Sequence, residues 1–310
     1  MSHDHGHEGH GHSHDTGGMS DARLWWAVAV NVGLTVAQIV GGIVAGSLAL
    51  IADALHNLND AATLALALFA RKVGRKPADK AMTFGYGRAE VIAALINLTT
   101  LIIVGLYLAY EAVARFFQPE PIDGWIVVVV AGVALAVDVV TAFLTYAGSK
   151  DSINIKAAFV HNVSDAAASV GVIVAGTLIL LYDLYIADLI VTLIISAYVL
   201  WQGVTLMPRT IRILMGATPS EIDFDEVMAA MRGVPGVRGV HHLHVWELDE
   251  RRRSLEAHVV IGRGDAPELE RIKGDVRGRL GAFDIGHCTL EIEFADAPCH
   301  DRGPAVLGGA

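Results

Sequence analysis

The sequence contains little cysteine and little charge. Only two of its 310 residues are cysteines, Cys288 and Cys299, and 18% of the residues are charged. Two cysteines cannot build the disulfide framework of a small secreted domain, and free thiols agree with a reducing cytosolic environment. The net charge of -10 argues against nucleic acid as a partner, because proteins that bind it carry basic surfaces. No secretory signal peptide is expected, since the first residues are polar and rich in histidine.

Hydrophobic residues, in contrast, are abundant. They make up 53% of the chain, and the mean hydropathy is +0.48, whereas soluble domains are about 45–50% apolar and about 25% charged. Crossing a bilayer takes about 20 consecutive apolar residues. Six segments approach this length, near residues 24–45, 48–70, 89–116, 125–147, 157–181 and 184–207. The sequence therefore predicts six transmembrane helices in contact with a lipid bilayer.

The lysines and arginines predict the orientation of these helices, because positively charged loops stay in the cytoplasm. They are concentrated in the loops after the second and fourth apolar segments: Arg71, Lys72, Arg75, Lys76, Lys80, Arg88, Lys150 and Lys156. The loops on the opposite side contain only Arg115. We expect a multi-pass protein of the inner or plasma membrane with both termini in the cytoplasm.

The two ends of the chain differ from its apolar part. Residues 1–20 contain six histidines among glycines and acidic residues, which predicts a disordered tail that either collects metal or only solubilises the chain. After residue 216 the apolar runs stop. The elements expected there are a helix at 223–231, strands at 237–247 and 254–261, a helix at 266–280 and a strand at 287–294. The order αββαβ predicts a ferredoxin-like α+β domain.

The predicted fold class is thus an α-helical membrane protein with a cytosolic α+β domain. Its expected parts are a histidine-rich tail (1–20), a six-helix transport domain (21–210), a metal-binding and dimerisation domain (211–298) and a flexible tail (299–310).

The most informative pattern is a His-Asn-x-x-Asp motif that occurs twice within apolar segments. It is His56 to Asp60 in the second segment and His161 to Asp165 in the fifth. On a helix, positions i and i+4 share one face, so two such helices could offer two imidazoles and two carboxylates to a tetrahedral Zn²⁺ ion. An ionisable side chain at the bilayer centre costs roughly 2.5–3.5 kcal/mol, which favours a shared function over simple packing or the lining of a water-filled crevice.

Metal and protons compete for such a site, because metal binding needs neutral imidazoles and ionised carboxylates. Between two halves that open alternately, the site would exchange a divalent cation for protons, and imidazoles that titrate near neutrality would carry them. Asp53 could be a ligand, an acceptor beside the ligands or a helix-end residue. Gln38, Asp138 and Asp188 could line the access path or bridge helices by hydrogen bonds.

Several motifs together resemble the cation diffusion facilitator family, close to its zinc-transporting branch. They are the two His-x-x-x-Asp motifs, Ser-Leu-Ala-Leu-Ile-Ala-Asp at 47–53, Phe-Gly-Tyr-Gly-Arg-Ala-Glu at 84–90 and Val-His-His-Leu-His-Val-Trp at 240–246. The resemblance implies a homodimer that exports divalent cations from the cytosol in exchange for protons. It also implies a tetrahedral site made by His56, Asp60, His161 and Asp165. Histidine at the first position of both motifs goes with Zn²⁺, with Cd²⁺ or Co²⁺ sometimes tolerated.

The resemblance further implies metal near the dimer interface of the C-terminal domain. The matching positions are His241, His258, Glu291 and Glu293. Histidine and carboxylate on adjacent strands suit zinc, and zinc bound there would be a regulatory ligand. Charged strand faces, however, are often only solvated. A passive dimerisation module is the alternative.

Three other functions compete with zinc export. An intramembrane metalloenzyme is disfavoured, because no His-Glu-x-x-His string occurs and four ligands leave no open position for catalysis; we predict no enzyme. A metal-responsive scaffold or sensor without transport remains an alternative, as does an exporter of nickel, manganese or iron, since these metals use similar ligands.

Overall fold

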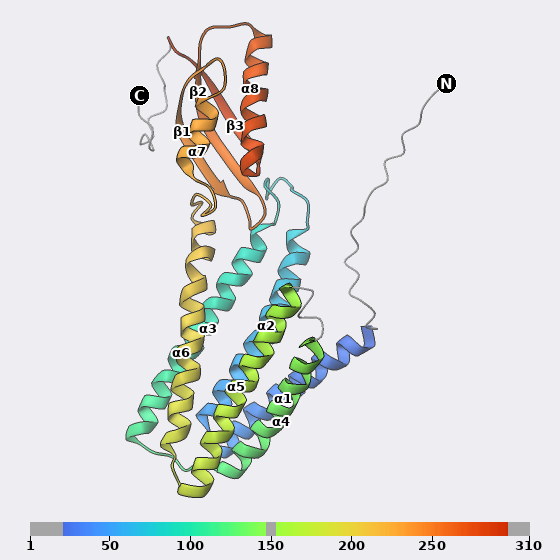
Figure 1. Ribbon diagram of the computed structural model, residues 1–310, viewed down its shortest axis with the longest axis vertical. Coiled ribbons are helices and arrows are strands. Elements are labelled where there is room, and N and C mark those ends of the chain that lie inside the picture. The colour runs from blue at the N-terminus through green and yellow to red at the C-terminus, as the bar shows by residue number, and fades with distance from the viewer. Residues whose placement is uncertain (1–20, 147–152, 297–310) are drawn as a thin grey trace, which may run out of the picture. The chain divides into compact units, whose positions relative to one another are not determined.

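The computed structural model of the protein describes residues 21–146 and 153–296 (Figure 1). The predictions for the histidine-rich segment 1–20 and the tail 299–310 lie outside these residues. Six long helices come first: α1 (Asp21–Ala45), α2 (Leu48–Gly74), α3 (Arg88–Phe117), α4 (Gly124–Tyr146), α5 (Ile153–Tyr182) and α6 (Ile186–Leu214). Each of them coincides, within a few residues or one to two turns at its ends, with one of the six apolar segments.

Four of these helices contain stretches that are long and apolar enough to cross a membrane. Among the described residues, the stretches are Arg88–Phe117, Gly124–Phe143, Phe159–Tyr182 and Ile186–Leu214. The described apolar stretch of α1, Val32–Ala45, is shorter. The polar residues of the first motif interrupt the apolar run of α2. The structure therefore contains a helical transmembrane domain with four candidate spans, and the count of six spans stays a prediction.

The chain forms two compact units. The first contains the residues up to Leu58 together with Pro119–Val191, and the second contains Asn59–Gln118 together with the residues from Thr192 onward. The boundaries between the units fall inside α2 and α6, so each of these helices contributes to both.

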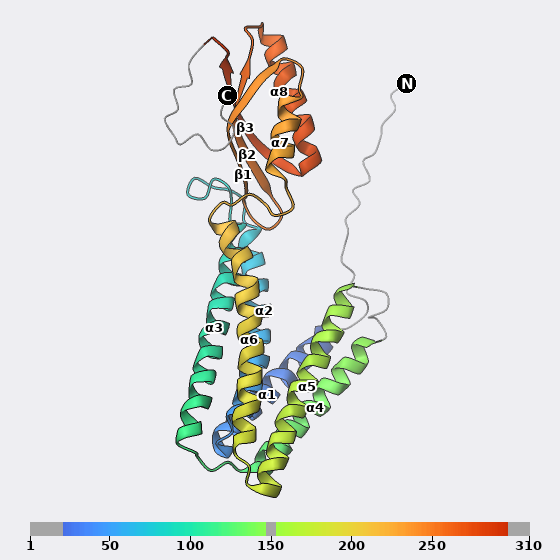
Figure 2. The same ribbon diagram turned by 60° about the vertical axis from the view of Figure 1, so that its left-hand side comes forward.

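Close helix packing characterises the first unit. The helices α4 and α5 lie side by side along their length (Figures 1 and 2). Gly176 permits this approach, because a Cβ atom there would lie 2.8 Å from Cγ1 of Val127. The turn between α1 and α2 uses Gly46 at a φ of +72°, a conformation that L side chains rarely adopt. The result is a tight turn between α1 and α2.

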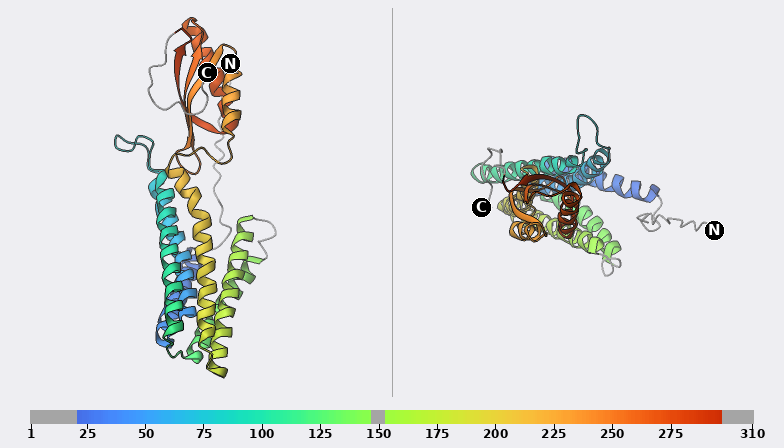
Figure 3. Two further views of the ribbon diagram at one scale, coloured as in Figure 1. Left: turned by 90° about the vertical axis from the view of Figure 1, so that its left-hand side faces the viewer. Right: turned by 90° about the horizontal axis from the view of Figure 1, so that it is seen from above.

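The C-terminal domain belongs to the second unit and has the predicted αββαβ order. Its elements are α7 (Phe224–Arg232), β1 (Val237–Glu247), β2 (Arg253–Ile261), α8 (Ala266–Leu280), the short 3-10 helix η2 (Gly281–Phe283) and β3 (Ile285–Phe294). The sheet order is β1-β2-β3, with β1 and β2 antiparallel and β2 and β3 parallel. The helices α7 and α8 lie next to each other on one face of the sheet (Figures 2 and 3).

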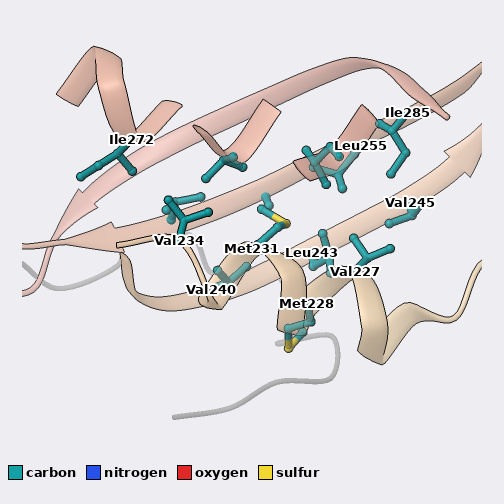
Figure 4. Close-up of a cluster of buried hydrophobic side chains, with 14 of the residues drawn as sticks. Val227, Met228, Met231, Val234, Val240, Leu243, Val245, Leu255, Ile272 and Ile285 are labelled. Atoms are coloured by element: carbon teal, nitrogen blue, oxygen red, sulfur yellow. The ribbon is translucent and has the colours of Figure 1, made fainter. Parts of the chain in front are cut away.

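Local signals in the sequence explain these elements. Asp223 and Asp265 cap α7 and α8, since their side chains accept hydrogen bonds from backbone N–H groups of the first turns. The apolar core lies between the sheet and the helices, where Met231, Leu243 and Leu255 are completely buried (Figure 4). Burying one such side chain contributes about 1.5–3 kcal/mol, so this core is what holds the strands that carry the domain's histidines.

Candidate metal centre

Three of the four residues of the paired motif meet within the first unit. His56 lies on α2, and His161 and Asp165 lie on α5. Oδ1 of Asp165 is 3.5 Å from Nε2 of His56, and Oδ2 of the same carboxylate is 3.4 Å from Nε2 of His161. The imidazole rings face each other edge to face, with centroids 6.3 Å apart. Asp165 thus lies between both histidines.

These distances agree with the dimensions of a metal site. Two ligand atoms of one tetrahedral Zn²⁺ ion, each about 2.05 Å from the metal, are roughly 3.3 Å apart. The carboxylate of Asp165 stands at nearly this separation from both rings. The ligand atom of His161 is not among those that lie within 4.8 Å of one another at this site, so its side chain would have to move toward His56 before the three groups could bind one ion.

Asp60 lies one turn after His56 on the same helix. The two side chains share a face of α2, and their ligand atoms lie within 4.8 Å of each other. The helix thus presents the His-Asp pair as the sequence predicts. His56 and Asp165 are buried, whereas the side chain of His161 is 44% exposed, so the histidines differ in their access to solvent.

A polar network links the two helices of the motif, α2 and α5, to α1 and α4. Nε2 of Gln38 on α1 donates to Oδ2 of Asp53 on α2 at 2.7 Å. Oγ of Ser169 on α5 lies 3.4 Å from this Asp53 oxygen and 3.1 Å from Oδ2 of Asp138 on α4. Of the two roles considered for Gln38 and Asp138, helix bridging is therefore the one that the contacts support, and Asp53 is the acceptor that Gln38 contacts. Ser169 was not among the expected polar residues. Only its position one helical turn after Asp165 could have indicated that its hydroxyl lies near the motif.

Asp188 also bridges helices. It is completely buried at the start of α6 and accepts hydrogen bonds from Oγ of Ser47, at 2.5 Å, and from the backbone N–H groups of Leu48 and Ala49 at 2.8 and 3.2 Å. These are the first residues of α2. A carboxylate distant in sequence thus caps the helix that carries His56.

A second cluster of histidines and carboxylates lies on the sheet of the C-terminal domain. His241 on β1 pairs with His258 on β2, and His258 pairs with Glu291 on β3. Glu293 bridges the histidines: its Oε1 is 2.9 Å from Nδ1 of His258 and its Oε2 is 3.1 Å from Nε2 of His241. Glu291 is 3.5 Å from Nε2 of His258, with a side chain that is 66% exposed. The fold therefore brings all four predicted residues together, with Glu291 at the edge.

His242 lies in the same cluster, although it was not one of the four expected ligands. A bulge between His241 and His244 interrupts the strand pairing, and His242 takes a positive φ of 47°. Its ring centroid lies 5.2 Å from that of His241 and 4.9 Å from that of His258. Alternation along a regular strand would direct neighbouring side chains to opposite faces, so only the bulge puts three imidazoles together. Cys299 and His300, two weaker candidate ligands in the sequence, lie outside the described residues.

Comparison with known proteins decides the family. Residues 24–215 match the model of the cation efflux transmembrane domain, and residues 219–294 match that of the cytoplasmic domain of cation efflux proteins. The chain belongs to the cation efflux family. The resemblance inferred from the motifs is thereby confirmed, and this cation efflux protein is a multi-pass membrane protein and not an enzyme.

Relatives of this cation efflux protein match along almost their whole length. The metal cation efflux system protein CzcD of Cupriavidus metallidurans is 35% identical over 306 residues, which cover 97% of each chain. The cadmium, cobalt and zinc/H(+)-K(+) antiporter of Bacillus velezensis is 33% identical and covers 95% of this chain and 94% of its own. The zinc transporter ZitB of Escherichia coli is 32% identical over 94% of both chains. Among solved structures, the metal-bound C-terminal domain of the CzcD transporter covers 23% of this chain and 99% of its own at 36% identity, with a TM-score of 0.22.

Proposed function

We propose that this protein exports Zn²⁺ from the cytosol in exchange for protons, through a membrane site made by His56, Asp60, His161 and Asp165. One observation carries the proposal: the carboxylate of Asp165 stands 3.4–3.5 Å from the imidazoles of two different helices, close to the ligand spacing of a tetrahedral ion. Relatives named for zinc, cadmium and cobalt transport support Zn²⁺ as the substrate, with Cd²⁺ and Co²⁺ as further candidates.

The same geometry suits proton exchange. When no metal is bound, a proton on His56 or His161 turns the contact with Asp165 into a charge-assisted hydrogen bond. Zn²⁺ needs both imidazoles neutral, so it must displace those protons when it binds. Protons arriving from the other side of the membrane would restore the His-Asp contacts and release the metal. Alternating access of one site would then couple the two fluxes without a further component.

The proposal also includes a complete architecture for the protein. It has six membrane-crossing helices in a transport domain (21–210), a ferredoxin-like C-terminal domain (211–298), and both termini in the cytoplasm of a cell whose inner or plasma membrane holds the protein. Two copies would form a homodimer through the C-terminal domains. The matched model of a cytoplasmic domain over residues 219–294 supports this arrangement.

The C-terminal cluster is proposed as a regulatory zinc site. His241, His258 and Glu293 offer ligand atoms that all lie within 4.8 Å of one another, and Glu291 would complete the set. Metal bound there would report cytosolic zinc to the transporter, because any metal that binds one conformation better shifts the protein toward it. A non-transporting sensor is the second candidate, and this cluster is the observation that favours it.

Transport in proteoliposomes tests the proposal. The purified protein would be reconstituted with a pH-sensitive dye inside, and Zn²⁺, Cd²⁺, Co²⁺, Ni²⁺, Mn²⁺ and Fe²⁺ would be offered in turn. Zn²⁺ flux with opposite proton movement is expected in the native protein and should be absent in Asp60→Ala and Asp165→Ala. Glu250→Ala, at an exposed position of the C-terminal domain, is the control. Metal flux that persists in both membrane variants, or that moves no protons, would refute the mechanism; zinc binding without any flux would favour the sensor.

A further inference from the structure

A pocket of about 350 Å³ lies between the α2–α3 connection and the β1–β2 hairpin. On one side it is lined by the end of α2, with Arg71, by the turn that follows, with Arg75, and by the start of α3, with Glu90. On the other side it is lined by the hairpin residues 249–252. All of these residues belong to the second compact unit, and none takes part in either metal cluster.

The pocket has an excess of positive charge. Its lining contains five basic side chains, Arg71, Arg75, Lys76, Arg251 and Arg252, and three acidic ones, Glu90, Asp249 and Glu250.

Partners inside the pocket already occupy two of the acidic side chains. Oδ2 of Asp249 accepts from Nε of Arg252 at 2.6 Å, and its Oδ1 accepts from the backbone N–H groups of Arg251 and Arg252. Burial favours a higher pKa for Asp249, but these hydrogen bonds outweigh it and lower the pKa overall. Glu90 lies 3.8 Å from Arg251. The acids thus stabilise the hairpin and leave other cations of the pocket without a counterion.

Arg71 and Arg75 are two of the three cations left over; the third, Lys76, lies over the ring of Tyr86. Within residues 21–146 and 153–296, neither arginine side chain forms an ion pair or a side-chain hydrogen bond. Both are exposed, Arg71 in the last turn of α2 and Arg75 just after it. The backbone N–H of Arg75 donates to the carbonyl of Arg71 at 3.2 Å, which continues the helical turn and puts both side chains on one face. Two adjacent guanidinium groups form a site suited to a phosphate group, which each can bind through two parallel hydrogen bonds.

The sequence positions put this pocket at the surface of the membrane. The candidate membrane span of α3 begins at Arg88, so Glu90 lies in its first turn. On α2, the apolar side chain of Leu68 is 60% exposed and lies one turn before Arg71 on the same face of the helix. Basic pockets at this depth, beside exposed apolar side chains, are where anionic lipid headgroups bind.

We propose that this pocket binds the phosphate of an anionic phospholipid. Arg71 and Arg75 would hold the phosphate from the membrane side, and an acyl chain would lie along Leu68, which shares their face. Arg251, whose contact with Glu90 is long at 3.8 Å, would turn to the phosphate from the hairpin side. The lipid would thereby connect the α2–α3 connection to the C-terminal domain. A free phosphate ester shares the headgroup chemistry but lacks the acyl chains, so the apolar side chain beside the arginines favours the lipid. This proposal does not depend on the metal that the protein carries.

Native mass spectrometry of the delipidated, full-length protein tests the proposal. Phosphatidylglycerol, phosphatidylcholine and soluble glycerol phosphate are the three probes. The native protein should retain phosphatidylglycerol in preference to phosphatidylcholine and should not bind glycerol phosphate at the same concentration. Arg71→Gln/Arg75→Gln should weaken phosphatidylglycerol binding by about tenfold or more, since two charge-assisted contacts are lost, and Arg251→Gln should weaken it as well.

The matched control is Lys72→Gln/Lys80→Gln, because both lysines lie in the same basic segment but do not line the pocket. It should change binding by no more than about twofold, as expected for exposed charges. Melting curves in detergent micelles without added lipid would verify that each variant is folded. Equal weakening by the two double variants would reduce the effect to general surface charge and overturn the proposal. Displacement of the lipid by glycerol phosphate would also overturn it, as would undiminished binding to Arg71→Gln/Arg75→Gln.

Discussion

The buried carboxylate of Asp188 allows the sharpest test of how the metal site is held in place. Asp188→Ala would leave three donors without their acceptor: the hydroxyl of Ser47 and the N–H groups of Leu48 and Ala49. Each buried donor without a partner costs about 1–3 kcal/mol. A water molecule entering the vacated space would recover part of this sum, so we expect a loss of roughly 3–5 kcal/mol.

Graded variants separate the contributions to this loss. Asp188→Asn keeps one carbonyl oxygen for the two N–H groups but turns an NH₂ group toward Ser47, and should cost roughly 1–2 kcal/mol. Ser47→Ala removes one donor to Asp188 and also the acceptor of the Leu50 N–H group, 3.1 Å away. Its expected cost is similar, roughly 1–3 kcal/mol. Stability should therefore fall in the order native, then Asp188→Asn or Ser47→Ala, then Asp188→Ala.

Thermal unfolding of the purified protein in detergent measures these effects. For a domain of this size 1 kcal/mol corresponds to roughly 2–4 °C, so Asp188→Ala should melt about 10 °C below the native protein. Since the cap precedes His56 by about two helical turns, Zn²⁺ affinity should fall as well. Asp183→Asn, at an exposed position just before α6, is the matched control. An Asp188→Ala protein that melts within about 2 °C of the native one would refute the capping argument.

Three further predictions concern the metal site, the α1–α2 turn and the β1–β2 hairpin of the C-terminal domain. Asp165→Asn should weaken Zn²⁺ binding by roughly 10²- to 10³-fold in calorimetric titrations, because a four-ligand site worth about 10–16 kcal/mol loses roughly a quarter of it with one ligand. Gly46→Ala should lower the melting temperature, because its Cβ would lie 2.9 Å from the Pro121 carbonyl oxygen at a φ of +72°. Asp249→Asn should be less stable than the native protein at pH 7. The pKa of this carboxyl is lower in the folded protein than in the unfolded chain, where it is about 4, so the ionised carboxylate stabilises the fold above that pH. The difference in stability between the two proteins should therefore shrink as the pH falls below about 4.

Each of these predictions has a control and an outcome that contradicts it. Asp183→Asn should bind Zn²⁺ normally, and native affinity in Asp165→Asn would remove that residue from the site. Gly132→Ala adds a Cβ with no atom within 4 Å; if it melts as low as Gly46→Ala, the turn is not the cause. Glu250→Gln controls for charge in the hairpin, and a stability gap of Asp249→Asn that is constant with pH would contradict the role of its pKa.

Local patterns in the sequence determined most of the secondary structure of this protein. Apolar length located the six long helices, and alternating patterns with turn residues located α7, β1, β2, α8 and β3 in their correct order. The His-Asp pairs also follow from local geometry, since residues four apart on a helix share a face whatever the helix packs against. The polar residues of the motif lower the hydropathy of α2, so apolar length alone does not place it among the candidate membrane spans.

Only the tertiary structure decided which distant groups meet. Nothing in the spacing of His56 and Asp165 shows that they lie 3.5 Å apart, or that Asp188 caps a helix that begins 140 residues earlier. The sequence also contained no indication of the bulge that brings His242 close to His258. Nor did it indicate the pocket beside the β1–β2 hairpin, in which basic side chains are in excess. Helical and strand periodicity depends on neighbouring residues alone, whereas these contacts depend on how whole helices and strands pack. The sequence therefore determined which ligand groups each helix presents to a metal ion. The packing that brings α2 close to α5 decided that His56 and Asp165 come together.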